Sequence, residues 1–287
     1  MPPAASIQDF CLSVLTCGDL ETKLAAPRGH HEGALRDAPG APVLIDGPAR
    51  DAGLRMSGGA ERLPRPNALA DPAARSECLA RFAHHELMAV ELFAWALLRW
   101  PEAPAELRRG LLGALADEQR HCRLYLTRLD DHGGAFLGRE HSDYFWRQAP
   151  AIAASPAGLR AFLAAMGLTL EQANLDFTLT YRDGFRAAGD EASARVCQSV
   201  HDDEIRHVAL AARWLPRLAE QSGTSSQPVA AYEEAVPFPL AASRAKGRRF
   251  DVASRRAAGL TDALIEHVRS ARSSQQTATT NRLARDA

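Results

Sequence analysis

The chain has 287 residues, 46% of them hydrophobic and 24% charged, with a formal net charge of -1. This composition is ordinary for a soluble globular protein, and the balanced charge gives no reason to expect nucleic-acid or membrane-surface binding. No apolar run approaches the ~20 residues that span a bilayer, and no secretory signal is recognisable, so we expect a cytoplasmic protein. The five cysteines are scattered without a Cys-x-x-Cys pair, which favours reduced thiols over disulfides.

Residues 1–72 form a predicted N-terminal extension with two parts. Residues 6–26 predict one amphipathic helix, because Ile7, Phe10, Val14 and Leu15 recur at helical spacing. Residues 27–72 are rich in Pro, Gly, Ala and Arg and lack periodicity. They are typical of either an extended, ordered wrap or a flexible linker, and both alternatives stay open.

Residues 73–221 carry four long helical patterns whose breaks fall at proline or glycine. The predicted helices cover residues 73–100, 104–132, 156–188 and 190–218. Short links join the first helix to the second and the third to the fourth, so each of these two pairs should be antiparallel. Residues 133–155 are long enough to cross from the first pair to the second. Two hairpins with one long crossover indicate an all-α, ferritin-like four-helix bundle. A C-terminal extension follows at 222–287, with one short helix at 261–270 and a disordered tail from Ser273.

One five-residue pattern, Asp-Glu-x-Arg-His, occurs in both the second and the fourth predicted helix. It runs from Asp117 to His121 and again from Asp203 to His207. A Glu and a His three residues apart lie on one helix face and can reach the same metal ion. One copy is common on solvated helix faces, but two copies in the middle of two long helices favour metal binding.

A dinuclear carboxylate site also needs one glutamate from each of the other two helices. Residues of an antiparallel hairpin share a level when they are equally far from its turn. By this measure Glu86 faces Glu118, which is 32 residues later, and Glu171 faces Glu204, which is 33 residues later. The predicted metal ligands are Glu86, Glu118, His121, Glu171, Glu204 and His207.

These six side chains lie in apolar stripes, where a buried carboxylate is costly unless it is paired or binds a metal. Four carboxylates and two neutral imidazoles balance two divalent ions. We therefore expect two metal ions per chain as the cofactor. Mixed oxygen and imidazole ligands favour iron, with manganese or a mixed Mn/Fe pair as alternatives and zinc also compatible.

Several neighbours of the predicted ligands have more than one interpretation. Asp117 and Asp203 are expected to accept a hydrogen bond from the ligand histidine of the adjacent helix, with Arg120 and Arg206 neutralising them. The remaining neighbours are polar or sulfur-containing residues close to the ligands. Glu91 is expected to form a salt bridge or to contact a ligand, and less readily to bind a metal itself. His84 and His201 are expected to be hydrogen-bonded core histidines or to contact a ligand, again in preference to binding a metal. Tyr125 is expected to be a core tyrosine, with a redox-active or ligand-contacting tyrosine as the alternative, and Cys122 and Cys197 are expected to be small packing residues.

The same segments resemble a bacterial ferritin-like family catalogued as domain of unknown function 455. The resemblance is carried by residues 83–92 (AHHELMAVEL), 117–121 (DEQRH), 171–176 (EQANLD), 203–209 (DEIRHVA) and 250–259 (FDVASRRAAG). It implies a ferritin-like fold and a dinuclear site at the six ligands named above, and it implies no substrate. One departure is Asn174 ahead of Leu175 and Asp176, where that family tends to carry Arg-Gly before Leu-Asp.

The doubled motif resembles that of di-iron hydroxylases and oxidases more than that of plain ferritins. We therefore expect an O₂-activating oxidoreductase with a small-molecule substrate and an unidentified electron donor, with a homodimer kept open as the assembly. The metal centre itself would carry the reaction, with Tyr125 the one catalytic side chain considered. Alternatives are a ferroxidase or iron-handling protein, a peroxide-scavenging protein, or a non-catalytic bundle that the metals stabilise.

Overall fold

The computed structural model describes residues 6–27, 35–58 and 62–272. Within these ranges the secondary structure is helical, and the only β-pairing is two isolated bridges. None of the helices described is long and apolar enough to cross a membrane. The chain divides into two compact units: unit 1 is Met1–Ala153 with Tyr181–Val200, and unit 2 is Ala154–Thr180 with His201–Ala287. The tail predicted from Ser273 lies outside the described residues.

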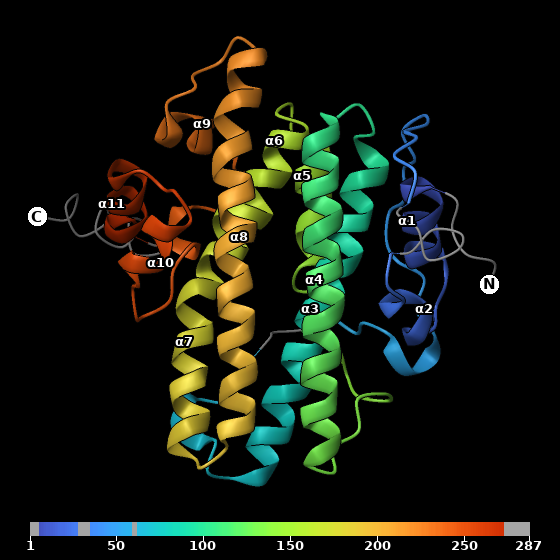
Figure 1. Ribbon diagram of the computed structural model, residues 1–287, viewed down its shortest axis with the longest axis vertical. Helices are drawn as coiled ribbons and strands as arrows, with labels where there is room; N and C mark the ends of the chain where they lie inside the picture. The colour runs from blue at the N-terminus through green and yellow to red at the C-terminus, as the bar shows by residue number, and fades with distance from the viewer. Residues whose placement is uncertain (1–5, 28–34, 59–61, 273–287) are drawn as a thin grey trace, which may run out of the picture. The chain divides into compact units, whose positions relative to one another are not determined.

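Unit 1 is built on the hairpin of α3 (Pro72–Arg99) and α4 (Ala105–Asp131), which run side by side (Figure 1). Asp71 caps α3 through the amide of Ala73, and proline takes the first helical position, where its missing N–H costs nothing. At the end of α4, Gly133 adopts a φ of 66°, and the Gly134 amide bonds the carbonyl of Leu129. Both helices agree with the predicted ranges.

The prediction of one helix over residues 6–26 was wrong, because two helices form there: α1 (Ile7–Thr16) and α2 (Leu20–Leu24), both packed on α3. Asp19 caps the start of the new helix, because its side chain accepts a hydrogen bond from the backbone amide of Thr22. Gly18 lies so close to Asp51 that an added Cβ would stand 2.2 Å from its carboxylate. The break is therefore set by a neighbour far away in the sequence.

The following segment packs along α3 where the structure describes it. The amide of Val43 bonds the carbonyl of Leu98, and the indole of Trp95 donates to the carbonyl of Ile45. These contacts correspond to the wrap alternative for residues 35–58; residues 28–34 and 59–61 lie outside the described ranges. Short helices here and later in unit 1 are η2 (Ala52–Leu54), η3 (Pro66–Ala68) and η4 (Trp146–Gln148), followed by α5 (Ala149–Ala154).

The core of unit 1 joins α3 and α4 to the unit 1 ends of α7 (Gln172–Ala187) and α8 (Glu191–Gln221). Phe82 packs its ring against Tyr125 and edge-on to Tyr181, at centroid distances of 5.2 and 4.9 Å. The turn between α7 and α8 passes through Gly189 at a φ of 78°, and the Asp190 amide bonds the carbonyl of Phe185.

Unit 2 contains an unexpected π-helix. The third predicted helix forms, but as α6 (Leu159–Phe162), the π-helix η5 (Leu163–Glu171) and then α7. All residues of η5 are buried. Gly167 allows the close approach of α8, since an added Cβ would lie 2.3 Å from that of Ala211. The register of Glu171 is therefore set by π geometry.

The C-terminal extension of unit 2 folds into short helices: α9 (Pro228–Ala235), η6 (Ala242–Arg244), α10 (Val252–Ala257) and α11 (Asp262–Ser270) (Figure 1). The α11 helix agrees with the prediction for 261–270, whereas α9 and α10 were not predicted. Tyr232 of α9 shares a hydrogen bond of 2.8 Å with Thr169 of η5. The extension is thus packed on the segment that leads to Glu171.

Candidate metal centre

Three predicted ligands meet in unit 1, and we call them the first triad: Glu86, Glu118 and His121. All three are buried, and each offers a ligand atom within 4.8 Å of those of the other two. Glu86 comes from α3, while Glu118 and His121 lie one turn apart on α4. The Nδ1 atom of His121 lies 3.1 Å from Oε2 of Glu118. The hairpin therefore places the residues at one level, as the distances from the turn predicted.

The other three predicted ligands meet in unit 2, and we call them the second triad: Glu171, Glu204 and His207. Their ligand atoms also lie within 4.8 Å of one another, and all three side chains are buried. Glu171 is the last residue of η5, and Glu204 and His207 lie one turn apart on α8. Oε1 of Glu204 accepts a 3.0 Å hydrogen bond from the amide of Asn174.

The second triad contains a buried oxygen that no protein group satisfies. Oε2 of Glu204 has no hydrogen-bond partner, although Nδ1 of His207 stands 3.5 Å away. A buried carboxylate oxygen without a donor is costly, and a cation bound there would remove the cost. Each triad offers two carboxylates and one imidazole, a donor set that suits iron, manganese or zinc. The two clusters could therefore each hold a metal ion.

The aspartates of the repeated motif pair with arginines of their own helices. Oδ1 of Asp117 lies 3.3 Å from Nη2 of Arg120, and Asp203 pairs in the same way with Arg206. This agrees with the expected neutralisation of the aspartates by the arginines. The expected bonds from the aspartates to histidines of the adjacent helix stay predictions.

Glu91 lies among cations. Its carboxylate is fully buried and pairs with Lys23 at 3.0 Å and with Arg50 at 2.7 Å, while the indole of Trp146 donates to it at 2.8 Å. Lys23 and Arg50 belong to the N-terminal extension. Glu91 therefore forms the salt bridge that was one of its two expected roles, and this salt bridge attaches the extension to the helix that carries Glu86.

His84 lies in the same network. Its Nε2 is 3.0 Å from Nη1 of Arg50, and its ring stacks on His141 at a centroid distance of 4.4 Å. Burial, followed by the charge of Arg50, holds the pKa of His84 well below its ordinary value. The neutral imidazole is therefore the form that this pocket favours.

His201 is a hydrogen-bonded histidine of the unit 2 core. Its two ring nitrogens lie 3.0 Å from the hydroxyls of Thr178 and Ser254. Thr178 already donates its proton to the carbonyl of Asn174, so Nδ1 of His201 should be the donor to Thr178. Both nitrogens are thus engaged by protein groups.

Tyr125 and the two nearby cysteines lie in the core of unit 1. The hydroxyl of Tyr125 contacts Sγ of Cys197 at 3.9 Å, and Sγ of Cys122 contacts the carbonyl of Ala83 at 3.1 Å. Burial raises the pKa values of all three side chains. Buried thiols and a buried phenol of this kind are typical of packing residues, and a redox role for Tyr125 stays a prediction.

Sequence reasoning missed the role of Asp176. This buried carboxylate accepts two bonds from the guanidinium of Arg255, at 2.7 and 2.9 Å, and two more from the amides of Gly247 and Asp251. Arg255 also lies over the ring of Phe250, 3.9 Å from its centroid. An arginine five residues after Phe250, in the otherwise polar extension, was the signal that could have indicated a buried partner.

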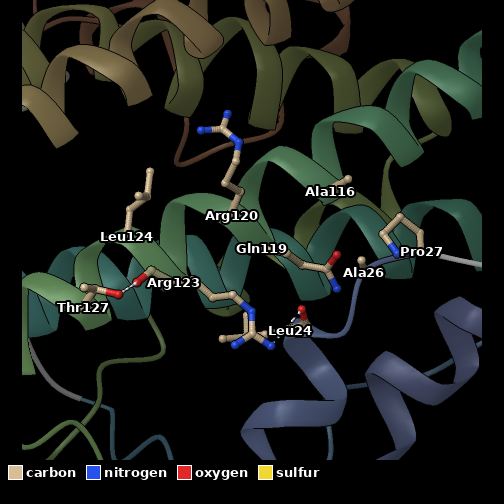
Figure 2. A pocket seen from close by; sticks show the side chains of 9 residues that line it. All are labelled: Leu24, Ala26, Pro27, Ala116, Gln119, Arg120, Arg123, Leu124 and Thr127. Atoms are coloured by element: carbon tan, nitrogen blue, oxygen red, sulfur yellow. Dashed lines mark hydrogen bonds between the residues drawn. The ribbon is translucent and has the colours of Figure 1, made fainter.

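A surface pocket of about 430 Å³ lies between the end of α2 and α4 (Figure 2). The pocket is lined on one side by Leu24, Ala26 and Pro27, and on the other by residues of α4 that include Arg120 and Thr127. The side-chain amide of Gln119 extends toward the α2 end and donates to the carbonyls of Lys23 and Ala25. Of these lining residues, Arg120 also reaches the first triad, because its Nη2 lies 3.4 Å from Nε2 of His121.

Comparison with known proteins identifies the family. A family model described as "Protein of unknown function (DUF455)" matches residues 18–266, a range that contains both triads and Arg255. No curated protein and no solved structure matches the chain. The match confirms the family resemblance seen in the four helices and in residues 250–259. The chain belongs to the DUF455 family.

Proposed function

We propose that the protein is a ferritin-like four-helix bundle whose two triads bind two metal ions. The observation that carries this proposal is the repetition of one buried donor set. Each triad has a Glu from one helix and a Glu-x-x-His from the next, and the two glutamates are 32 residues apart in the sequence in one hairpin and 33 in the other. This is the arrangement expected of a dinuclear carboxylate site.

The chemistry of the donors favours iron as the metal, with manganese or a mixed Mn/Fe pair as alternatives. Four carboxylates would balance two divalent ions, and both imidazoles would bind as neutral ligands. Burial of all six side chains would keep water from the metals and strengthen every electrostatic interaction in the site. The ion pairs Asp117–Arg120 and Asp203–Arg206 would hold these four side chains in place beside the ligands of α4 and α8.

We propose further that the protein is an O₂-activating oxidoreductase. Two bound ferrous ions would supply the electrons for O₂ reduction. The protein's part is to hold the ligands at one level, to exclude water and to keep Glu204 oriented through Asn174. The substrate is proposed to be a small molecule, and an external donor must return the electrons after each turnover.

The first test is metal analysis of the purified protein together with a paired variant. The wild type should hold two metals per chain, and the Glu118→Ala/Glu204→Ala variant should lose them, because each triad loses its central carboxylate. A Glu106→Ala/Glu220→Ala variant is the matched control, since these glutamates are exposed on the same two helices. A Glu118→Ala/Glu204→Ala variant that keeps the full native metal content would refute the proposed site.

The second test addresses the reaction. Protein loaded with Fe²⁺ without oxygen should develop a ferric absorption band when O₂ is admitted. Two bound metals with no O₂-dependent change would instead assign them the stabilising role, and chelation should then collapse the fold. A multi-subunit shell on size-exclusion chromatography would favour iron storage over catalysis.

A further inference from the structure

The two hairpins differ at one position of otherwise matching triads. Three residues after the first glutamate of each hairpin, the α3 helix has Ala89 and the α7 helix has Asn174. Residues three apart in an α-helix lie about 4.5 Å apart along the axis and are neighbours on the surface. Ala89 therefore lies next to Glu86 on α3, whereas Asn174 lies in the first turn of α7, directly after the end of η5 at Glu171.

The consequence of this difference is visible in the hydrogen bonds. The amide of Asn174 donates to Oε1 of Glu204 at 3.0 Å. Ala89, which is 3% exposed, has only a methyl group and can donate no such bond to Glu118. The Glu118 carboxylate is instead contacted by a ligand side chain, since Nδ1 of His121 lies 3.1 Å from its Oε2. The difference is therefore that Glu204 has an orienting donor, Asn174, that is not itself a candidate ligand.

The bond also distinguishes the two oxygens of Glu204. Oε1 is occupied by the amide, whereas Oε2 has no hydrogen-bond partner and lies 3.5 Å from Nδ1 of His207. A metal held by this triad would meet Oε2 together with His207. The amide stops rotation of the carboxylate, so the ligand oxygen is already oriented before the metal arrives.

We propose that the two metal positions are inequivalent and that Asn174 is the positioning residue responsible, so that the second triad takes its metal first. This inference rests on the proposed function, in which each triad holds one metal. Partners that orient a metal ligand typically contribute roughly 10- to 100-fold to metal affinity. Replacing Asn174 should therefore weaken one binding step and leave the other unchanged.

The alternative is that Asn174 only joins α7 to α8. A structural bond of this kind would change the melting temperature of the metal-free protein but would not separate the two binding steps. The stepwise affinities are therefore the readout that a structural role does not move.

The experiment is a titration of metal-free, full-length protein with Co²⁺, followed by calorimetry and by the visible absorption of the bound ion. The wild type should bind two Co²⁺ in two separable steps. In Asn174→Ala the tighter step should weaken roughly 10- to 100-fold while the other is retained. Thr180→Ala is the control, because Thr180 lies on α7 and its hydroxyl donates only to the carbonyl of Asp176.

Three results have defined meanings. Unchanged affinities in Asn174→Ala, or an equal loss in both steps, would overturn the role of Asn174. A wild type that binds no Co²⁺ would overturn the proposed metal site itself. Loss confined to the tighter step, with Thr180→Ala behaving as wild type, would support the inequivalence of the two positions.

Discussion

Replacing Arg255 by methionine should destabilise the protein strongly, because the change leaves a buried charge without its counter-ion. The side chains of Arg255 and Asp176 are 0% and 1% exposed. The guanidinium donates two charge-assisted bonds to this carboxylate and another to the carbonyl of Ala245. Breaking a buried pair from one side costs about 3–5 kcal/mol.

The structure places the expected loss at the lower end of that range. Asp176 keeps two hydrogen bonds in the variant, from the amides of Gly247 at 2.8 Å and Asp251 at 2.7 Å. We therefore expect Arg255→Met to lower the free energy of unfolding by about 3 kcal/mol.

The assay is urea unfolding of the full-length chain, followed by far-UV circular dichroism. Arg256→Met is the matched control: the neighbouring arginine pairs with Asp262, but their side chains are 64% and 80% exposed. Its loss should cost less than about 1 kcal/mol. Adding Asp176→Asn to Arg255→Met should restore part of the stability, since no charge is then stranded and the side-chain oxygen can still accept a backbone hydrogen bond. If Arg255→Met is as stable as Arg256→Met, the buried-pair reasoning is wrong.

Three further predictions concern single positions. Gly167→Ala should cost about 1–3 kcal/mol because its methyl would meet that of Ala211, and Ala211→Gly should restore the loss in thermal melting; a stabilised Gly167→Ala would contradict this packing. Glu91→Gln should cost about 3 kcal/mol in urea unfolding, because buried cations lose their counter-ion, and wild-type stability would refute this. Burial raises the pKa of Asp190, but hydrogen bonds from Ser193 and His132 and the charge of Arg128 lower it to about 2. Its stabilisation is therefore complete above the unfolded pKa of about 4 and is lost as the pH falls through the folded pKa of about 2. Asp190→Asn should be less stable than wild type at about pH 6, and this difference should have become small near pH 2; a difference that does not shrink in acid would contradict the assignment.

The long helices and the candidate ligands were accessible from the sequence because their signals are local. Helix ends are marked by residues that act within one turn, such as Gly133 and Gly189 at positive φ. Likewise, Glu118 and His121 share a face by spacing alone, and distance from the turn is enough to find Glu86 opposite them. Helical periodicity and turn positions therefore brought each triad together in the prediction.

The remaining features depend on residues far apart in the chain, so only the tertiary structure decided them. The break at Gly18 depends on the neighbouring Asp51, and the π-helix can pack against Ala211 because residue 167 is a glycine. No local sequence pattern predicts either contact. The same applies to the buried charges: Glu91 finds cations from the N-terminal extension and Asp176 finds Arg255. Local propensity set which segments became helices, whereas steric contact and charge pairing across the chain set how they are interrupted, anchored and oriented.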